Sequence, residues 1–407
     1  MGLRIVLATL LIGGCSFGFL AGCGAQLGAA HDLVPLTGQK RAVSTAPQQL
    51  AWHKTFIKGQ LLTESSRETA RAAYDPKSRL MWLGTAHSSF KCINSVSGQV
   101  VWEIDVPGGS RGEAIWHDGA VYFGGEGGQF LALDAATGEQ KWSYKVQAAV
   151  RRAPVISGGL VIFVDGANTI IALEHRTGKW RWQYRRDPPK HFALAGEARP
   201  IVVDGRVYLG FSDGHLVALS STDGTVAWSQ RLSDPNATFQ DADARAAFSE
   251  GVLYASSVSG DLFALDPVTG KVKWRQSVGG ALQLSVFQGD LILAQPKGRL
   301  FRFDVYKRKT VWSIAVNDQW GSPTEIEQSG DNLVVGWSKG GLYWVDGRTG
   351  EPTLQFNPGS GISARPLVTQ DGIYVLANQG TLFAFRTNLL RRTQQKTPLV
   401  TSPGRGL

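Results

Sequence analysis

One segment of eleven residues recurs along the chain and limits what the chain can fold into. Ala132–Trp142 and Ala264–Trp274 share the pattern Ala-Leu-Asp-x-x-Thr-Gly-x-x-Lys-Trp. Weaker copies of the pattern occur at Ala172–Trp182 and Ala218–Trp228. The residues at the tryptophan position are Trp102, Trp142, Trp182, Trp228, Trp274, Trp312 and Leu354, at intervals of 40, 40, 46, 46, 38 and 42 residues. A period near 40 to 45 residues with several short strands per unit is typical of β-propeller blades.

Three turn signals divide each repeat into four strands. Asp118-Gly119 and Asp204-Gly205 each precede an alternating apolar run, a second glycine turn follows about nine residues later, and the Thr-Gly pair makes the third. Glycine makes up 49 of the 407 residues, above the roughly 7 percent of an average protein. Tight hairpin turns need positive φ, which glycine adopts without steric cost. The sequence therefore predicts four-stranded antiparallel blades.

The number of blades follows from the two ends of the repeat region. The last unit, from Pro366 to Phe385, has no Thr-Gly turn and no tryptophan, so its outer strand is missing. The segment Leu50–Phe56 is a lone alternating strand that carries Trp52. Pairing this strand with the last unit removes an exposed sheet edge. We therefore predict an all-β, eight-bladed β-propeller over residues 49–386, closed by an N-terminal strand and monomeric.

The recurring tryptophans are interpreted as structural. One indole ring on each outer strand would wedge between neighbouring blades and bury a large apolar surface. A ligand-stacking role is the alternative, but a ligand site would break the symmetry that every repeat shows. Leu354 and Arg308, where a turn glycine is expected, depart from the pattern. The predicted docking residues are Trp52, Trp102, Trp142, Trp182, Trp228, Trp274 and Trp312.

The N-terminal segment has the pattern of a sorting signal. One arginine, Arg4, precedes a short apolar stretch, and Leu-Ala-Gly stands directly before Cys23. This resembles the lipobox of bacterial lipoproteins, with residues 1–22 as the signal peptide and Cys23 as the acylated N-terminus. The alternative is an ordinary secretory signal with an incidental cysteine. The expected location is the periplasmic face of the outer membrane, with residues 23–48 as a flexible tether and 387–407 as a disordered tail.

The charge pattern argues against nucleic-acid binding. The formal net charge is +9, but lysine and arginine occur as short scattered pairs such as Arg151-Arg152 rather than as one stripe. We interpret these pairs as solvated turns, with a surface for anionic lipid or an acidic partner as the alternative. Cys92 is left without an intramolecular partner once Cys15 and Cys23 are assigned to the signal and the anchor. It is expected to be a small buried hydrophobic residue.

The repeat resembles the tryptophan-docking repeat of quinoprotein-type propellers, and it covers residues from about 50 to 386. Together with the lipobox and a short tether, the chain is similar to the BamB family, the scaffold lipoproteins of the outer-membrane β-barrel assembly machinery. This resemblance implies a non-catalytic partner of the barrel-inserting subunit, which helps the assembly and insertion of outer-membrane proteins. Binding of unfolded outer-membrane protein segments is a further expectation by analogy.

Two insertions carry the residues that the resemblance assigns to partner binding. The 46-residue intervals place extra length after Trp182 and after Trp228, in connections where insertion is tolerated and function concentrates. In the family, an apolar-x-apolar-Arg-Gly stretch and an Asp-x-Asp bind the periplasmic domains of the barrel-inserting subunit. In this chain Ala195 replaces the arginine, and Arg199 is a nearby cation. The alternative is that these residues begin a strand and cap a turn. The matching residues are Phe192, Leu194, Gly196, Arg199, Asp241 and Asp243.

The sequence shows no catalytic or cofactor motif that its context supports. The seven histidines have no close pairing of the kind that metal sites use, and no two cysteines are adjacent. Gly336–Gly340 spells a nucleophile motif but falls between two predicted strands of a hairpin. We therefore predict no enzyme activity, no metal and no cofactor. The alternatives are a quinone-cofactor-dependent dehydrogenase, or an anchored scaffold for another envelope complex or a glycan.

Overall fold

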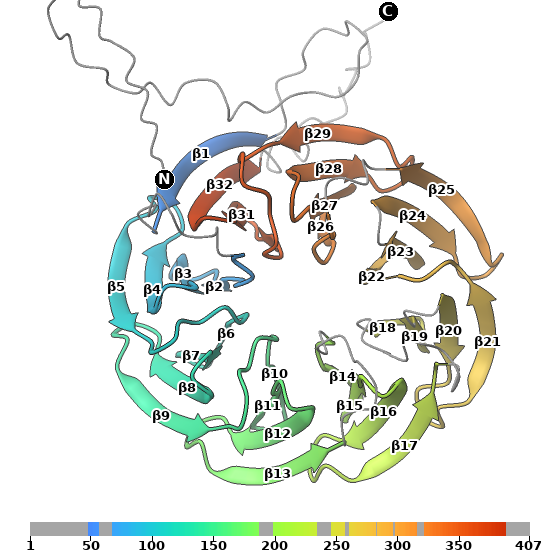
Figure 1. Cartoon of the computed structure of the whole chain (residues 1–407), viewed down its shortest axis with the longest axis horizontal. Helices are drawn as coiled ribbons and strands as arrows, with labels where there is room; N and C mark the ends of the chain where they lie inside the picture. The colour runs from blue at the N-terminus through green and yellow to red at the C-terminus, as the bar shows by residue number, and fades with distance from the viewer. Residues whose placement is uncertain are drawn as a thin grey trace, which may run out of the picture.

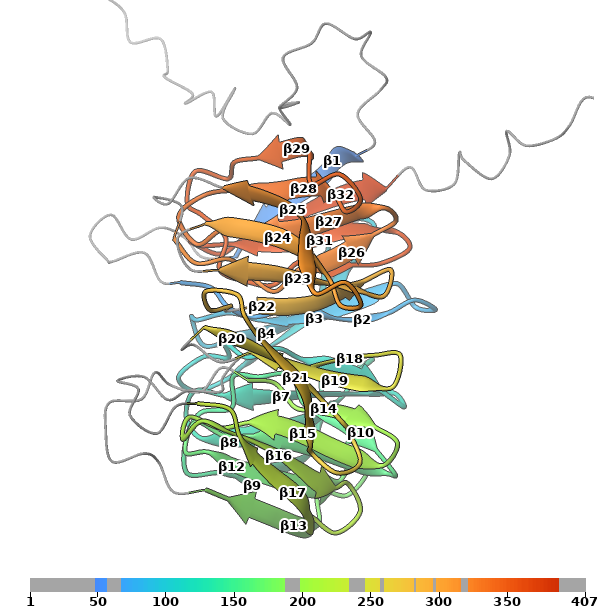
Figure 2. The ribbon, with the colours of Figure 1, turned by 90° about the vertical axis from the view of Figure 1, so that its right-hand side faces the viewer.

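The computed structural model describes residues 48–56, 67–186, 198–233, 246–256, 260–281, 283–295, 298–315 and 321–387. Within these residues the chain forms eight four-stranded antiparallel sheets arranged as a ring (Figure 1). Seen from the side, the ring is a disc with the sheets stacked around it (Figure 2). The predicted eight-bladed propeller is confirmed. The same residues include no helix that could cross a membrane.

The first four blades follow one another along the chain. Blade 1 consists of β2 (Ala73–Asp75), β3 (Leu80–Gly84), β4 (Ser89–Asn94) and β5 (Val100–Asp105). Blade 2 consists of β6 (Ile115–His117), β7 (Ala120–Gly125), β8 (Gln129–Asp134) and β9 (Gln140–Lys145). Blade 3 consists of β10 (Val155–Ser157), β11 (Leu160–Val164), β12 (Thr169–Glu174) and β13 (Trp180–Arg185). Blade 4 consists of β14 (Ile201–Val203), β15 (Arg206–Gly210), β16 (His215–Ser220) and β17 (Val226–Arg231).

The remaining blades repeat this order until the last. Blade 5 consists of β18 (Ala247–Ser249), β19 (Val252–Ser256), β20 (Asp261–Leu265) and β21 (Val272–Ser277). Blade 6 consists of β22 (Gln283–Phe287), β23 (Asp290–Gln295), β24 (Arg299–Asp304) and β25 (Lys309–Ala315). Blade 7 consists of β26 (Glu327–Ser329), β27 (Asn332–Gly336), β28 (Leu342–Asp346) and β29 (Pro352–Phe356). Blade 8 consists of β30 (Leu367–Val368), β31 (Gly372–Ala377), β32 (Thr381–Thr387) and β1 (Gln48–Thr55).

Ring closure joins the two ends of the propeller. β1 pairs antiparallel with β32, so that Leu50 lies opposite Phe385 and Trp52 lies opposite Ala384. The first and last described strands reach Gln48 and Thr387, one residue outside the predicted limits of the propeller at each end. The N-terminal strand therefore completes blade 8 as the sequence predicts.

The tryptophan at the repeat position of an outer strand lies against the next blade. The indole of Trp182 lies so close to Gly224 that a Cβ on this glycine would stand 2.6 Å from the ring, and its Nε1 donates to the Ser221 carbonyl at 3.2 Å. Trp52, Trp102, Trp142, Trp228 and Trp312 make the same pair of contacts with the turns around Gly98, Gly138, Gly178, Gly270 and Gly350. The blades are thus linked in one direction around the ring.

A β-bulge directs each of these indoles. The register of every outer strand shifts by one residue just before the tryptophan position, for example at Arg181 between Trp180 and Trp182. A bulge bends the strand locally and re-aims the side chain that follows. The same shift precedes Trp52 in β1, although that strand comes from the other end of the chain. β1 therefore has the local geometry of an outer strand in its own right.

The two departures from the repeat have structural consequences. Arg308 takes the turn position with φ of 52°, and its guanidinium lies 5.9 Å from the ring centre of Trp274. Within the described residues Trp274 makes no indole hydrogen bond to that turn, unlike the other six predicted docking tryptophans. Leu354 is 3% exposed and packs against blade 8 in a cluster that includes Phe383. Blade 8 has no turn before its outer strand, because β1 supplies that strand, so no turn glycine exists there to receive an indole.

The hydrophobic core lies between neighbouring sheets rather than at the centre of the ring. Phe90 of blade 1 stacks on Phe123 of blade 2 with ring centres 3.7 Å apart. Cys92 is fully buried in the same layer, and burial raises the pKa of its thiol to about 12. As expected, Cys92 is a buried free cysteine that packs as a small hydrophobic residue.

The contact between indole and glycine can be separated from the cost of positive φ with two glycines of blade 4. Gly224 (φ +73°) faces Trp182, whereas Gly205 (φ +74°) has no neighbour within 4 Å of an added Cβ. We expect Gly205→Ala to cost about 1–2 kcal/mol of stability for its left-handed backbone. Gly224→Ala should cost about 1–3 kcal/mol more, because the indole must move. Urea unfolding of both variants checks this, and equal losses would contradict the docking role.

Two tryptophans of β13 provide a second comparison. Trp182 is 5% exposed and docks on blade 4, whereas Trp180 is 48% exposed. We expect Trp182→Ala to lower the free energy of unfolding by about 3–5 kcal/mol, as loss of a buried aromatic ring does. Trp180→Ala should cost less than about 1 kcal/mol, since surface substitutions rarely cost more. Denaturant midpoints measured by far-ultraviolet circular dichroism, in which the backbone amides dominate the signal, provide the check.

Candidate functional site: the central channel and its mouth

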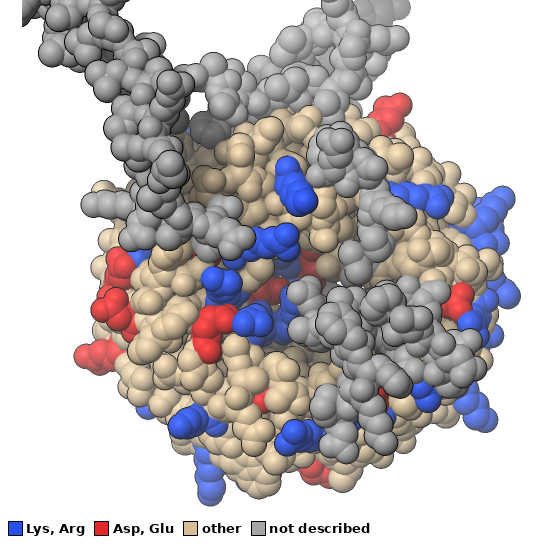
Figure 3. Space-filling view, in the orientation of Figure 1, with Lys and Arg blue, Asp and Glu red and all other residues tan. Residues whose placement is uncertain are grey.

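One face of the disc carries the connections that lead from each outer strand to the inner strand of the next blade. We call it the entry face, and Figure 3 shows it with lysine and arginine side chains around the central opening and acidic side chains between them. The inner strands surround the central channel (Figure 1), so the residues just before each inner strand lie at the channel. These connections therefore decide which side chains enter the channel.

Charged residues recur at one position of these connections, two residues before the inner strand begins. In five of the seven blades where this position is described it is charged, and in blades 3 and 6 it is alanine. The five residues are Arg71, Glu113, Arg199, Glu325 and Arg365. Because the position is equivalent in each blade, these side chains meet at one level of the channel. With Glu327, the first residue of β26, they form what we call the channel network.

The channel network spans the axis of the ring. Arg199 of blade 4 lies 2.7 Å from the Glu325 carboxylate of blade 7 and 3.4 Å from that of Glu113 of blade 2. Arg365 of blade 8 lies 3.2 Å from Glu325 and 3.6 Å from Glu113, and it also pairs with Glu327. The network therefore connects blades that are not neighbours in the ring, such as blades 4 and 7.

Burial and charge act on the arginines of the network in opposite directions. Burial opposes the charge of Arg365, but the carboxylates of Glu325, Glu327 and Glu113 outweigh this effect and raise its pKa. Among the described residues Arg71 forms an ion pair with Glu327 alone, at 3.5 Å, and burial together with the nearby Arg365 lowers its pKa. Three arginines face three glutamates, so the network is neutral overall. Such a group tolerates burial only while all its members are present.

The structure places Arg199, the one described member of the predicted partner-binding set, inside this network. Its side chain is 9% exposed and its charge is matched by two carboxylates. The other predicted partner-binding residues lie outside the described residues: Phe192, Leu194, Gly196, Asp241 and Asp243. The predicted lipidation site, Cys23, also lies outside them. A contact between these residues and a partner stays a prediction.

The network itself was missed by reasoning from sequence. Its members stand far apart in the chain, and each looks like an ordinary turn charge when read locally. The available signal was the common offset: a charged residue two positions before the inner strand in blade after blade. The boundaries of inner strands that are only two or three residues long in most blades are hard to place from sequence, so the offset is not visible without the structure.

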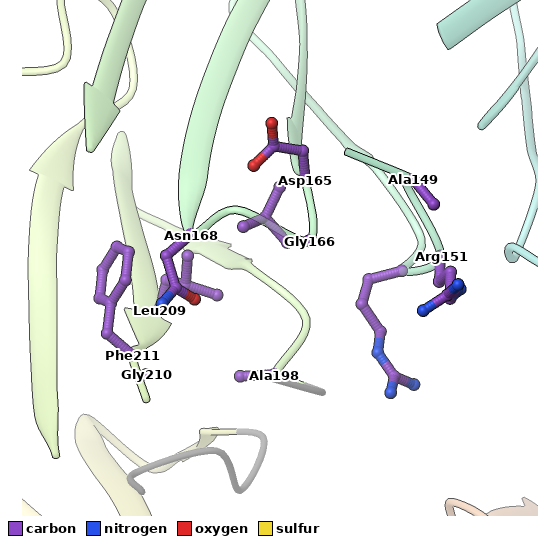
Figure 4. Close-up of a pocket in the computed structure, with 11 residues that line it drawn as sticks. Ala149, Arg151, Asp165, Gly166, Asn168, Ala198, Leu209, Gly210 and Phe211 are labelled. Carbon is purple, nitrogen blue, oxygen red and sulfur yellow. The ribbon is translucent and has the colours of Figure 1, made fainter. Parts of the chain in front are cut away.

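A second hollow lies between blades 3 and 4 on the entry face. It has a volume of about 110 Å³. Figure 4 shows Arg151 on one side of it and Asn168, Leu209 and Phe211 on the other. Asp165 also lines the hollow, but its carboxylate accepts the amide protons of Ala167 and Thr169. The carboxylate is thus already used to hold its own turn.

The described part of the chain does not fit a metal-assisted quinone site. It holds no group of three or more His, Cys, Asp or Glu side chains that could bind a metal ion. The carboxylates of Glu113, Glu325 and Glu327 each lie beside an arginine of the network. An arginine competes with a cation for the same carboxylate oxygens. The carboxylates of the channel are therefore engaged by arginines.

Removal of one arginine tests the channel network. We expect Arg199→Met to cost about 3–5 kcal/mol of stability, because Glu113 and Glu325 stay buried with less compensation. The control is Arg176→Met, which breaks a surface ion pair between Arg176 and Asp118. The Arg176 side chain is 76% exposed. This control should leave the midpoint nearly unchanged. Urea midpoints measured for both variants check this, and a similar small shift for both would show that the network adds nothing to stability.

Comparison with solved structures shows the same fold in proteins of different function. BamB from Moraxella catarrhalis has a TM-score of 0.72 and 20% identity, and the match covers 83% of this chain and 99% of that one. The quinohemoprotein alcohol dehydrogenase ADHIIG from Pseudomonas putida HK5 has a TM-score of 0.67 and 14% identity, with 89% and 79% covered. The computationally designed Ika8 protein has a TM-score of 0.63 and 17% identity, with 79% and 97% covered. At these identities the likeness shows the fold alone.

The sequence comparison is more specific. Among curated proteins, none matches the chain significantly. The family model described as outer membrane protein assembly factor BamB matches residues 86–314, more than half of the chain. The matched region runs from blade 1 into the outer strand of blade 6 and so contains most of the docking tryptophans. The chain therefore belongs to the BamB family of outer membrane protein assembly factors.

Proposed function

We propose that this protein is a non-catalytic scaffold lipoprotein of the outer-membrane β-barrel assembly complex. It binds the periplasmic domains of the barrel-inserting subunit and helps outer-membrane proteins to assemble and insert. The observation that carries this proposal is the match of residues 86–314 to the family described as an outer membrane protein assembly factor. The fold likeness to BamB from Moraxella catarrhalis, which extends over 99% of that chain, supports it.

The entry face is the proposed binding surface. The two long connections lead into β14 and β18, the inner strands of the adjacent blades 4 and 5. In a propeller, adjacent blades place equivalent connections side by side, and such loops are where binding residues concentrate. Arg199 anchors the end of the first connection in the channel network. The rigid ring would therefore present both connections together.

Capture of the partner tests the proposal as a whole. The full-length protein is purified by affinity from solubilised outer membranes, and the recovered proteins are identified by mass spectrometry. We expect the barrel-inserting subunit to be recovered in stoichiometric amount. Recovery of a different envelope complex without this subunit would favour the alternative scaffold role.

Charge reversal tests the predicted interface. We expect Asp241→Lys with Asp243→Lys to weaken capture by at least about tenfold, because a favourable pair becomes a repulsive one. The matched control is Asp331→Lys with Glu351→Lys, which makes the same charge change at turns on the opposite face. It should not alter capture. Both variants should unfold close to the parent, and equal capture by both would remove Asp241 and Asp243 from the interface.

Anchoring through Cys23 is the proposed basis of localisation. Diacylglycerol on this cysteine would hold the propeller at the periplasmic face of the outer membrane through its hydrocarbon chains. Cys23→Ser should move the protein from the membrane fraction to the soluble periplasmic fraction, as followed by fractionation and immunoblotting. Retention of this variant in the outer membrane would contradict the lipid anchor.

A quinone-dependent dehydrogenase is the second candidate, favoured by the fold shared with the quinohemoprotein alcohol dehydrogenase. Incubation with a quinone cofactor and calcium, followed by a dye-reduction assay with alcohol and sugar substrates, distinguishes the two. We expect no reduction above that of the cofactor alone. Turnover that depends on the protein would overturn the scaffold proposal.

A further inference from the structure

A cavity with an excess of arginines lies at the mouth of the channel on the entry face. It has a volume of about 310 Å³, and four of its lining arginines come from the connections into blades 1, 2 and 3. We call them the mouth arginines: Arg67, Arg111, Arg151 and Arg152. Arg365 of the channel network also lines the cavity. Its volume is at the lower end of the range that small-molecule sites occupy.

The positive charge of this cavity is not balanced by its own walls. Five arginines line it, against two carboxylates, Glu113 and Glu325. Both carboxylates already lie beside Arg199 and Arg365 in the channel network. The floor of the cavity is therefore part of a neutral network, and Arg67 and Arg111 add their charge above it.

Two mouth arginines have no partner within the described structure. Arg151 binds Glu126 through two nitrogens, with donor-to-acceptor distances of 2.6 to 3.2 Å. The guanidinium groups of Arg67 and Arg111 make no ion pair or hydrogen bond with any residue that the structure describes. Arg67 is exposed and Arg111 is half-buried, so both are available at the cavity.

The floor of the cavity holds a buried hydroxyl that lacks a hydrogen bond. Ser363 Oγ is buried and has no hydrogen-bond partner among the described residues. Arg365 also lines the floor, and its Nη1 lies 3.2 Å from Glu325 and 3.6 Å from Glu113. A buried polar group left without a partner costs free energy that a bound ligand would recover. An acceptor between the floor and the rim would satisfy both the Ser363 hydroxyl and the unpaired arginines.

We propose that this cavity binds a small anion that carries two or more carboxylate or phosphate groups. The planar guanidinium fork matches the oxygens of either group in bidentate fashion. The anion lies against Ser363 and Arg365 and is held from above by Arg67 and Arg111. The cavity is compact and closed beneath by the channel network, so it suits a small ligand rather than an extended strand. This site is independent of the proposed scaffold function.

Calorimetric titration of the full-length protein with citrate and with pyrophosphate, at constant ionic strength, tests the site. We expect saturable binding of at least one of these anions, with one ligand per protein and Kd below about 1 mM. Arg67→Gln with Arg111→Gln should weaken that binding by at least about tenfold, because two charge-assisted contacts are lost. No saturable binding of either anion to the parent protein would overturn the proposal.

Two further variants separate a built site from general surface charge. Arg176→Gln with Arg181→Gln removes the same charge from blade 3 away from the cavity, where each arginine pairs with a surface carboxylate. Its affinity should stay within about twofold of the parent, because screening weakens distant charges. Arg67→Lys with Arg111→Lys keeps the charge but loses the fork, and should bind between the parent and the glutamine variant. Equal weakening in the control would also overturn the proposal, and circular dichroism verifies that every variant is folded.

Discussion

The ring is held together by indoles that lie on residues without side chains. Each tryptophan docked on a glycine uses the open surface of that turn glycine and the backbone carbonyl three residues before it, as Trp182 does with Gly224 and Ser221. The contact is local, yet its repetition sets the angle between one blade and the next. The rigid channel and the placing of the entry-face connections both follow from that spacing, so a surface made of loops acquires a fixed geometry.

The sequence predicted the blades and their closure because both depend on local patterns. A turn glycine and a tryptophan at fixed spacing indicate one hairpin of a blade. The unpaired strand around Trp52 indicates the outer strand that the last blade lacks. The two departures were visible but not explained. Leu354 replaces an indole because blade 8, completed by β1, offers no turn glycine, which is a consequence of ring topology rather than of the repeat. Arg308 adopts the glycine conformation and lies over Trp274 instead.

The candidate site could not be predicted in the same way. Arg199 and Glu325 are neighbours only because the ring brings blade 4 and blade 7 to a common axis. No spacing within one repeat encodes that contact. The pair Arg151-Arg152 illustrates the limit: it was interpreted as a solvated turn, and its place at the channel mouth became visible only once neighbouring connections were assembled around it. Charge patterns along a chain do not reveal which charges share a cavity.

Closure by β1 and β32 also has a consequence for how the chain matures. β1 precedes every other described strand in the chain, and its partner β32 is the last described strand. A chain that emerges from its N-terminus during synthesis and export therefore holds β1 unpaired until β32 has also emerged. Until β32 arrives, the apolar layers on both sides of blade 8 stay open to water. Transient exposure of this kind invites aggregation and proteolysis. A nick that removes only the final strand would therefore uncover two inter-blade layers at once.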